Sequence, residues 1–113
     1  MGICGVGIDV EDIERFRRAD YRENKVFYEG IFTDEEIRYC LGKDDPYPHF
    51  AARFTAKEAY VKACGGAVKN LKEIEVVRLD GGCAIRSPCK GRCHLSISHS
   101  TDVAVAVVIL EEP

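Results

Sequence analysis

The fold is decided by one stretch of sequence, residues 51–66, which reads Ala-Ala-Arg-Phe-Thr-Ala-Lys-Glu-Ala-Tyr-Val-Lys-Ala-Cys-Gly-Gly. Its apolar spacing predicts a helix from about His49 to Cys64, and the glycines that follow are a strong helix stop. Projected at about 100° per residue, this helix has two apolar faces. The smooth face contains Ala52, Ala56, Ala59 and Ala63, and the bulky face contains Phe50, Phe54 and Val61. We therefore expect the helix to be buried on two sides.

A narrow polar strip lies between these two faces. It contains Thr55, Glu58 and Lys62, with Lys57 close to the bulky face. One interpretation is an ordinary i,i+4 pair between Glu58 and Lys62 on a wet surface, worth roughly a few tenths of a kcal/mol. So narrow a charged strip in so apolar a helix instead favours the lining of a cleft, where desolvation shifts the pKa of such groups.

A second acidic position lies near the N-terminus. The segment Gly5-Val6-Gly7-Ile8 alternates glycine with apolar residues, which predicts a strand over about residues 3–8 whose neighbours approach closely. Asp9 follows directly, where we expect the strand to give way to a helix. If the fold joins Asp9 to Glu58, the two carboxylates form a divalent-metal and phosphate site beside two lysines.

The helix expected next, over about residues 10–21, has a basic outer face. Ile13 and Phe16 carry its inward spacing, and the outer charges are Glu14, Arg15, Arg17, Arg18 and Arg22. This face can dock a partner, or it can be a solvated surface with i,i+4 pairs such as Glu14 with Arg18. Locally, the sequence favours the solvated surface.

The remaining segments supply a short helix and several strands. Thr33 and Glu36 form a capping box for a helix over residues 34–41, and a loop over 43–48 follows. Residues 74–79 are extended and lead to a turn at 80–82, and strands over 95–98 and 103–110 flank a turn at 99–102. These patterns predict an α+β fold with helices packed on one side of a mainly antiparallel sheet.

The last of these turns, Ser98-His99-Ser100-Thr101, gathers hydroxyls and an imidazole at a strand end. Such groups, with exposed backbone amides, can hold a phosphate. A histidine in a polar turn is nevertheless more often a plain solvent-facing residue. Ser98 and His99 point to opposite faces of the strand, so we do not expect a catalytic dyad.

The composition describes one domain over residues 1–113. The chain is 46% hydrophobic and 31% charged with a net charge of -3. This balance argues against nucleic-acid binding, and no apolar run approaches the roughly 18 residues of a membrane span. We expect no secretory signal, a cytoplasmic location and six cysteines that remain thiols.

Four motifs together resemble the holo-acyl-carrier-protein synthases, the short type of 4'-phosphopantetheinyl transferase. They are Gly7-Ile8-Asp9 with Asp12 and Arg15, residues 32–36, residues 53–65 and residues 95–100. The resemblance covers most of residues 3–66 and 94–110. It implies a phosphopantetheinyl-transferase-like fold and transfer of the phosphopantetheine arm from coenzyme A to a serine hydroxyl of apo-acyl carrier protein. Adenosine 3',5'-bisphosphate is the second product.

The resemblance also implies roles for the matched positions. Asp9 and Glu58 match the Mg²⁺ ligands, Glu58 is the expected base for the serine hydroxyl, and Lys62 is expected to steady the phosphate charge and the leaving group. The implied contacts with coenzyme A are Arg53, Lys57, Lys62, Gly65, His99 and Ser100, the last two at the 3'-phosphate. Arg15 matches the carrier-docking arginine, with Arg22 beside it on the basic face. Because the short members are homotrimers, His99 of one subunit is expected to face Asp9 and Glu58 of another.

Two departures from the family pattern leave alternatives open. Glu11 creates an Asp-x-Glu pattern like that of the double-length transferases, and it either offers a third carboxylate or is exposed. Residues 81–93 are too short and too rich in breakers for the usual strand and full helix. One alternative is therefore a non-catalytic module that binds coenzyme A or a nucleotide. Another is a zinc-binding interaction domain built on Cys83, Cys89, Cys93 and His94, whose spacing matches none of the common zinc patterns.

Overall fold

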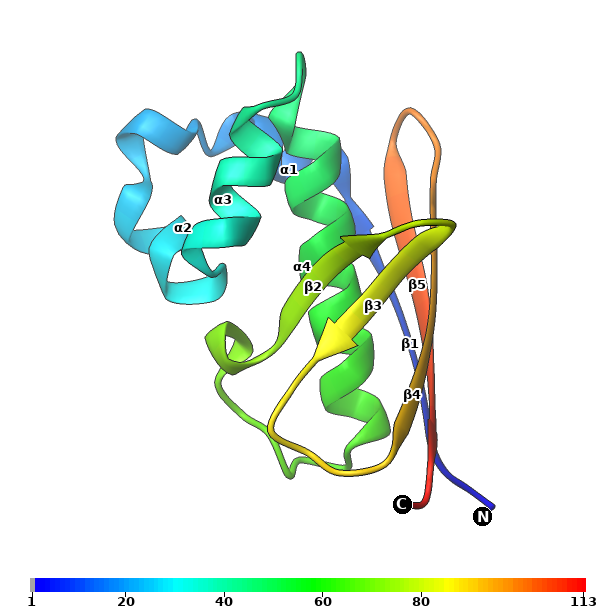
Figure 1. Cartoon of the computed structure of the whole chain (residues 1–113). Coiled ribbons are helices and arrows are strands. Elements are labelled where there is room, and N and C mark those ends of the chain that lie inside the picture. The colour runs from blue at the N-terminus through cyan, green and yellow to red at the C-terminus, as the bar shows by residue number, and fades with distance from the viewer. Residues whose placement is uncertain (1) are drawn as a thin grey trace.

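The computed structural model describes residues 2–113, and a long central helix organises it (Figure 1). The helix α4 (Pro46–Ala63) lies between a three-stranded sheet on one side and a β-hairpin with short helices on the other. The other elements, in chain order, are β1 (Ile3–Asp12), α1 (Ile13–Arg18), the 3-10 helix η1 (Tyr21–Glu23), α2 (Lys25–Ile31), α3 (Asp34–Leu41), the 3-10 helix η2 (Leu71–Glu73), β2 (Glu75–Leu79), β3 (Gly82–Arg86), β4 (Arg92–His99) and β5 (Val103–Glu111).

The sheets are antiparallel throughout. The larger one has the strand order β1-β5-β4, and β2 pairs with β3 in a separate hairpin. All helices lie on one face of the larger sheet (Figure 1). The predicted α+β architecture, with helices on one side of an antiparallel sheet, is therefore confirmed.

The smooth face of α4 packs directly on β1. A Cβ atom added at Gly7 would lie 1.8 Å from the carbonyl oxygen of Ala59, and one added at Gly5 would lie 2.0 Å from that of Ala63. Only glycine permits this approach of strand and helix. The glycines of β1 thus pack against the alanine face of α4, and this contact places Asp9 beside α4.

The bulky face of α4 lies in an aromatic core. The ring centroids of Phe50 and Tyr28 are 4.7 Å apart, those of Phe50 and Phe32 are 5.0 Å apart, and those of Phe54 and Phe16 are 5.4 Å apart. Aromatic pairs at such separations stabilise a core beyond the area they bury. Both predicted buried faces of α4 are therefore confirmed.

The first helix is shorter than predicted. Val10, Glu11 and Asp12 continue β1 and pair with residues 103–105 of β5, so the helix begins at Ile13 and ends at Arg18. The expectation of a helix over residues 10–21 is wrong at its start because cross-strand pairing with β5 extends β1 to Asp12. Its inward residues, Ile13 and Phe16, are buried as expected.

Two other helices differ from the prediction. Helix α2 was not predicted, and α4 begins at Pro46 instead of near His49. The carboxylate of Asp45 caps α4 by accepting from the backbone amide of Tyr47, and a proline is well suited to the first helical position. The expected loop over residues 43–48 is correspondingly shorter.

The segment between Asp80 and His94 contains β3 and two turns, and it contains no helix, as its length and breakers predicted. The turn into β3 passes through Gly81 at φ +84, a left-handed conformation that favours glycine. The hairpin β2–β3 crosses in front of α4 in Figure 1 and packs against both α4 and β4.

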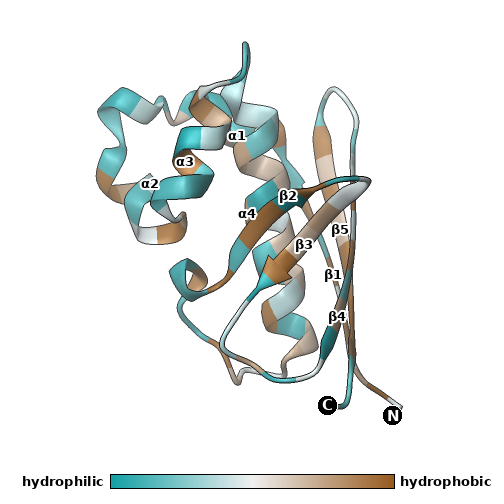
Figure 2. Cartoon of the chain, in the orientation of Figure 1, coloured by the Kyte–Doolittle hydropathy of each residue, from teal (hydrophilic) through white to brown (hydrophobic). Residues whose placement is uncertain are grey.

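On β1 and β5, the outer face of the larger sheet is apolar and uncovered within the chain. Val6, Ile8 and Val10 of β1 are 59%, 61% and 60% exposed. They pair with Ile109, Val107 and Val105 of β5, and hydrophobic colours run along both strands in Figure 2. A contiguous apolar surface of this kind marks an interaction site.

Within residues 2–113, no helix combines the length and apolarity needed to cross a membrane.

Candidate active site

Asp9 and Lys62 meet where β1 crosses α4. The Lys62 ammonium donates to Asp9 Oδ1 at 3.1 Å and to the carbonyl oxygen of Ile8 at 2.9 Å. The Asp9 side chain is only 10% exposed, and its second oxygen, Oδ2, is buried without a hydrogen-bond partner among residues 2–113. An unsatisfied buried carboxylate oxygen is costly, so this atom is suited to a cation that arrives with a ligand.

Glu58 lies near the same carboxylate. Burial is the main reason why its pKa is raised above the ordinary value, and the negative charge of Asp9 raises it further. Lys62 and Arg15 act in the opposite direction. The sequence hypothesis that the fold joins Asp9 to Glu58 therefore agrees with the electrostatics of this site.

Glu11 extends this acidic strip along the inward face of β1. Its side chain is 17% exposed and accepts from the Arg15 guanidinium at 3.0 Å. Burial and the neighbouring carboxylate of Asp9 raise the pKa of Glu11 to about 7. The alternative that Glu11 is an exposed residue is thereby excluded.

The carboxylates suit Mg²⁺ as a partial ligand set. No group of three or more His, Cys, Asp or Glu side chains in the described part of the chain converges as a complete metal site. Mg²⁺ commonly takes one or two carboxylates and fills its other positions with water and substrate phosphate. The pair Asp9 and Glu58, with the partnerless Asp9 oxygen, fits that pattern.

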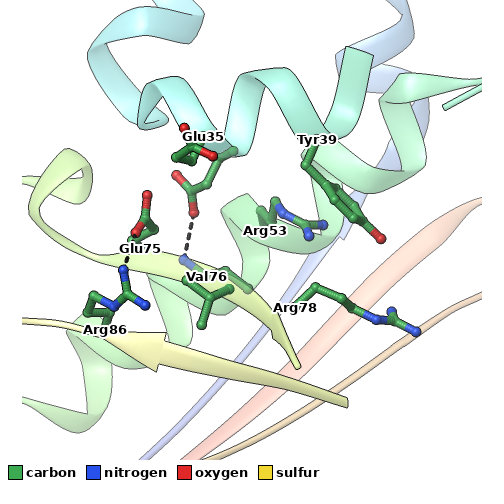
Figure 3. Close-up of a pocket in the computed structure, with 9 residues that line it drawn as sticks. Glu35, Tyr39, Arg53, Glu75, Val76, Arg78 and Arg86 are labelled. Atoms are coloured by element: carbon green, nitrogen blue, oxygen red, sulfur yellow. Dashed lines mark hydrogen bonds and ion pairs between the residues drawn. The ribbon is translucent and has the colours of Figure 1, made fainter. Parts of the chain in front are cut away.

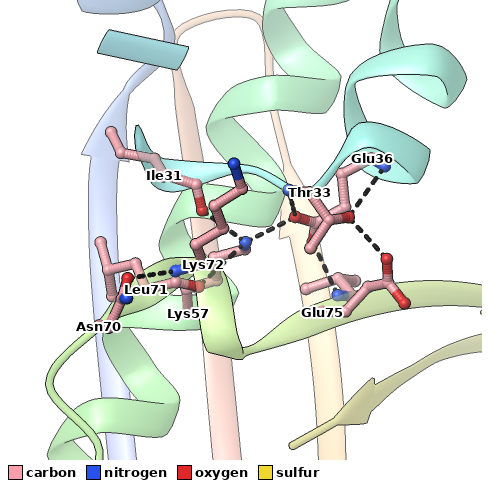
Figure 4. Close-up of polar contacts among 9 residues, drawn as sticks. Ile31, Thr33, Glu36, Lys57, Asn70, Leu71, Lys72 and Glu75 are labelled. Atoms are coloured by element: carbon pink, nitrogen blue, oxygen red, sulfur yellow. Dashed lines mark hydrogen bonds and ion pairs between the residues drawn. The ribbon is translucent and has the colours of Figure 1, made fainter. Parts of the chain in front are cut away.

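Lys57 is part of the core instead of the site (Figure 4). Its ammonium is fully buried and donates to Glu36 Oε1 at 2.5 Å, to the carbonyl oxygen of Ile31 at 2.7 Å and to that of Leu71 at 3.1 Å. The three donors of the ammonium are thus all used. The expectation of a direct contact between Lys57 and coenzyme A is corrected accordingly.

Glu36 completes this buried network. Its carboxylate also accepts from the backbone amides of Thr33 at 2.9 Å and Val76 at 2.7 Å. The capping box was predicted from Thr33 and Glu36, but the ion pair joins residues 21 positions apart, and no local pattern signals it. Through these bonds Glu36 connects α3 and β2 to α4, the helix that also carries Glu58.

Arg53 and His99 line a second cavity, of about 430 Å³, between the hairpin β2–β3, α4 and β4. Arg53 is only 4% exposed, and its guanidinium carbon lies 4.1 Å from the ring centroid of Tyr39. Figure 3 shows Arg53, Tyr39 and Arg78 beside the adjoining cavity, whose volume is about 330 Å³. The structure therefore brings two of the predicted coenzyme A contacts together.

The other predicted contacts lie elsewhere. Gly65, at φ +62, follows α4 at its C-terminal end, next to Lys62 and with open space around it. The Ser100 hydroxyl accepts from the backbone amides of Asp102 and Val103, both at 3.3 Å, and so caps its own turn. Because Arg53 and Lys62 are separated by about 14 Å along the axis of α4, the predicted ligand contacts fall into two groups.

The basic residues predicted for docking are exposed. Arg15 is held by Glu11 and lies 5.4 Å from the ring centroid of Phe54, while Arg22 lies in η1. The pair of Glu14 with Arg18, at 3.8 Å, is also present, but such exposed pairs contribute little to stability.

The cysteine cluster does not have the geometry of a zinc site. All six cysteines are free, and Cys83, Cys89 and Cys93 are half-buried against the core. His94 Nε2 lies 2.9 Å from Glu111 Oε2. Together with the lack of any three-ligand group in residues 2–113, this arrangement argues against the zinc-binding alternative.

Two carboxylates with a lysine at one place, and a cavity lined by arginine and histidine at another, define an enzyme for phosphate-bearing substrates. The family profile described as the 4'-phosphopantetheinyl transferase superfamily matches residues 5–108. The chain belongs to this superfamily, which confirms the resemblance, the fold and the class of enzyme inferred from the sequence.

Individual relatives agree with this assignment. The holo-[acyl-carrier-protein] synthase of Syntrophotalea carbinolica is 40% identical, with 96% of each chain covered, and that of Chlamydia trachomatis serovar D is 40% identical, with 95% and 98% covered. The crystal structure of a holo-(acyl-carrier-protein) synthase from Bacillus anthracis, in complex with CoA (3',5'-ADP), superposes with a TM-score of 0.87 at 35% identity and covers 98% of each chain. The synthase from Neisseria meningitidis also gives a TM-score of 0.87, at 26% identity, covering 98% of this chain and 100% of the other.

Proposed function

We propose that this chain transfers the 4'-phosphopantetheine group from coenzyme A to a serine hydroxyl of apo-acyl carrier protein and releases adenosine 3',5'-bisphosphate. The observation that carries the proposal is the partnerless, buried oxygen of Asp9 beside Lys62 and Glu58, on the fold of this transferase superfamily. The site suits attack on a pyrophosphate because the charge of the non-bridging oxygens has to be neutralised.

Glu58 is our candidate for the general base. Its raised pKa, caused first by burial, makes it a better proton acceptor than an ordinary carboxylate. As the serine oxygen forms its bond to the phosphorus next to the pantetheine arm, the serine proton passes to Glu58. The bond from that phosphorus to the bridging oxygen breaks, and its electron pair leaves with adenosine 3',5'-bisphosphate.

Asp9 and Lys62 hold opposite charges at the place where the pyrophosphate is expected. Lys62 already spans Asp9 and the carbonyl of Ile8, so its ammonium is fixed and can steady the charge of the leaving group. Asp9 and Glu58 are the proposed ligands of Mg²⁺, which when bound neutralises charge on the phosphate oxygens.

A homotrimer with active sites between subunits is the assembly that we propose. The uncovered apolar face of β1 and β5 needs a partner, and a second copy of the chain offers the same face or a neighbouring one. Sharing of sites also explains why Arg53 and His99 lie apart from Lys62 and Gly65 within one chain. We propose that His99, and with it Ser100, faces the carboxylates of a neighbouring subunit.

The carrier protein is proposed to dock on the basic surface of α1 and η1. Arg15 and Arg22 are exposed there, and Arg15 is held close to the acidic strip through Glu11. Complementary charge accelerates encounter with an acidic carrier and weakens as salt is added. The six free thiols agree with the reducing cytoplasm as the place of this reaction.

The test is mass spectrometry of apo-acyl carrier proteins, of fatty-acid and polyketide type, incubated with the chain, coenzyme A and Mg²⁺. We expect a gain of one phosphopantetheine group that is lost with EDTA and with Glu58→Gln, whereas Glu29→Gln, at an exposed glutamate on α2, retains it. Absence of the gain with every carrier, despite measurable binding of coenzyme A, would favour the non-catalytic module instead.

A further inference from the structure

The segment that carries Arg22 has no core of its own. It is the 3-10 helix η1, which is three residues long and contains no fully buried residue. Arg22 itself is exposed, and the chain on either side leads directly into α1 and α2. A single turn of this kind makes too few apolar contacts to offset the entropy lost when it is ordered. Contacts from another element therefore have to hold η1 in place.

Asp20 connects this turn to α4. Its Oδ2 accepts from the backbone amide of Arg22 at 3.1 Å and so caps η1. Its Oδ1 accepts from the hydroxyl of Tyr47 at 3.2 Å. Tyr47 lies in the first turn of α4, 27 positions further along the chain. One carboxylate thus caps η1 and joins it to the central helix.

The Tyr47 hydroxyl completes this connection from the side of α4. It donates to Asp20 and accepts from the backbone amide of Tyr21 at 3.0 Å. The ring of Tyr21 is nearly parallel to that of Phe50, about one turn further along α4, with the ring centroids 6.2 Å apart. The position of η1 is therefore set by one hydroxyl and one aromatic contact from the beginning of α4.

A second capping carboxylate makes the reciprocal connection. Asp45 caps α4 by accepting from the backbone amide of Tyr47 at 3.2 Å, and its other oxygen accepts from Arg17 of α1 at 2.9 Å. The bond from Arg17 holds the pKa of the Asp45 carboxyl below its ordinary value. Two cross-connected caps consequently tie α1 and η1 to the helix that also carries Glu58 and Lys62.

We propose that Asp20 and Tyr47 are positioning residues for the carrier protein, which fix η1 on α4 so that a carrier bound to Arg22 presents its serine to Glu58. This inference rests on the proposed function. A carrier bound to a loosely held turn would reach Glu58 in many orientations, and a misplacement of about 1 Å is enough to slow a reaction. The charge of Asp20 supports a geometric role, because a carboxylate on a basic docking surface repels an acidic partner.

The decisive experiment separates geometry from charge at Asp20. Asp20→Ala and Asp20→Asn both remove the negative charge, but asparagine can still cap η1 with its oxygen and bond to the Tyr47 hydroxyl with its amide. The transfer rate is measured with the carrier varied at saturating coenzyme A, and then with coenzyme A varied. If Asp20 acted through its charge alone, both variants would use the carrier better than the wild type does.

We expect Asp20→Ala and Tyr47→Phe to lower kcat/KM for the carrier by about three- to tenfold, as for one or two lost hydrogen bonds, and to leave KM for coenzyme A unchanged. Asp20→Asn should retain at least the wild-type kcat/KM. An equal rise for both Asp20 variants would overturn the proposal.

Tyr60→Phe is the matched control for Tyr47→Phe. It removes a hydroxyl from the same helix together with one hydrogen bond, to Ser87 Oγ at 2.8 Å, but it lies about 20 Å from Tyr47 along the axis of α4. Tyr60→Phe should leave kcat/KM for the carrier unchanged. A loss as large as that of Tyr47→Phe would show that any weakening of α4 has this effect, and would overturn the specific role of Tyr47.

Hydrogen exchange gives a readout that is independent of turnover. Because the Tyr21 amide donates to the Tyr47 hydroxyl, Tyr47→Phe should speed its exchange about three- to tenfold and leave the amide of Ile37 in α3 unchanged. Unchanged exchange at Tyr21, or faster exchange with an unchanged kcat/KM for the carrier, would overturn the proposal. If the wild-type chain modified no carrier, the proposed function and the docking role would both fail, while the exchange rates would still decide whether Tyr47 fixes η1.

Discussion

Replacing Gly7 by alanine should damage both the fold and the site. The added Cβ would lie 1.8 Å from the carbonyl oxygen of Ala59 and 2.9 Å from the backbone nitrogen of Ala63. To reach even the 3.0 Å below which real Cβ contacts essentially never occur, the strand and the helix have to separate by about 1.2 Å. Since β1 is held by its ladder with β5, we expect α4 to move.

The magnitude follows from what the added atom meets. Overpacking of a core typically costs about 1–3 kcal/mol, and here the obstacle is backbone rather than a flexible side chain. We therefore expect Gly7→Ala to lower the free energy of unfolding by about 3 kcal/mol. The control is Gly30→Ala in α2, where nothing lies within 4 Å of the new atom. Because alanine favours a helix, this variant should be stabilised by about 0.5–1 kcal/mol.

The same displacement separates the carboxylates. Glu58 precedes Ala59, and Asp9 lies two residues beyond Gly7, so a shift of α4 stretches the 3.1 Å contact of Lys62 with Asp9. A misplacement of about 1 Å can reduce turnover by about a hundredfold. Urea unfolding and the transfer rate are measured at a temperature where both variants are folded. If Gly7→Ala keeps wild-type stability and turnover, the close contact of β1 and α4 is refuted.

Three further predictions concern the core, the assembly and the thiols. Lys57→Met should lower the free energy of unfolding by about 3–5 kcal/mol because Glu36 is left buried without its partner. Urea unfolding should show the double variant Lys57→Met/Glu36→Gln to be more stable than Lys57→Met alone. A wild-type unfolding midpoint for Lys57→Met would contradict this reasoning. Val6→Glu should reduce the mass in analytical ultracentrifugation, whereas Val26→Glu, at an even more exposed position on α2, should not; equal masses for both variants would exclude the outer sheet face as the subunit contact. Burial raises the pKa of the Cys40 thiol to about 12. Raising the pH from 7 to 9 should therefore leave Cys40 unalkylated in the native protein while the exposed Cys4 reacts, as measured by peptide mass spectrometry. Alkylation of Cys40 in the native protein would show that the aromatic core opens readily.

Local patterns were sufficient for the elements whose stabilising contacts are close in sequence. The capping box of α3, the two apolar faces of α4 and the closing hairpin β4–β5 all follow from spacings within a few residues. The extension of β1 did not, because its last residues are held by β5, about ninety positions away. Helix α2 was missed since it is short and packs chiefly through Tyr28.

The same distinction applies to the site. Asp9, Glu58 and Lys62 were selected from a glycine-rich strand, a narrow polar strip on the helix and the resemblance to the family, and the structure brings Asp9 and Lys62 into contact where β1 crosses α4. Their catalytic roles stay predictions. Lys57 was misinterpreted because its partner Glu36 is supplied by another helix. The roles of Arg15, Arg22, Gly65, His99 and Ser100 stay predictions.

The contact between Gly7 and Ala59 has no layer of side chains in it. Ordinary strand-helix interfaces can absorb a ligand-induced shift by changing rotamers, but here backbone meets backbone and no rotamer is available. The distance between the backbones that carry Asp9 and Glu58 is consequently fixed by main-chain contact. The cavity beside Arg53, in contrast, is lined by side chains from α3, α4, β3 and β4 and by Arg78 of β2. The two ends of α4 thus differ, because backbone contact holds the end beside Asp9, whereas side chains that can change rotamer line the cavity beside Arg53.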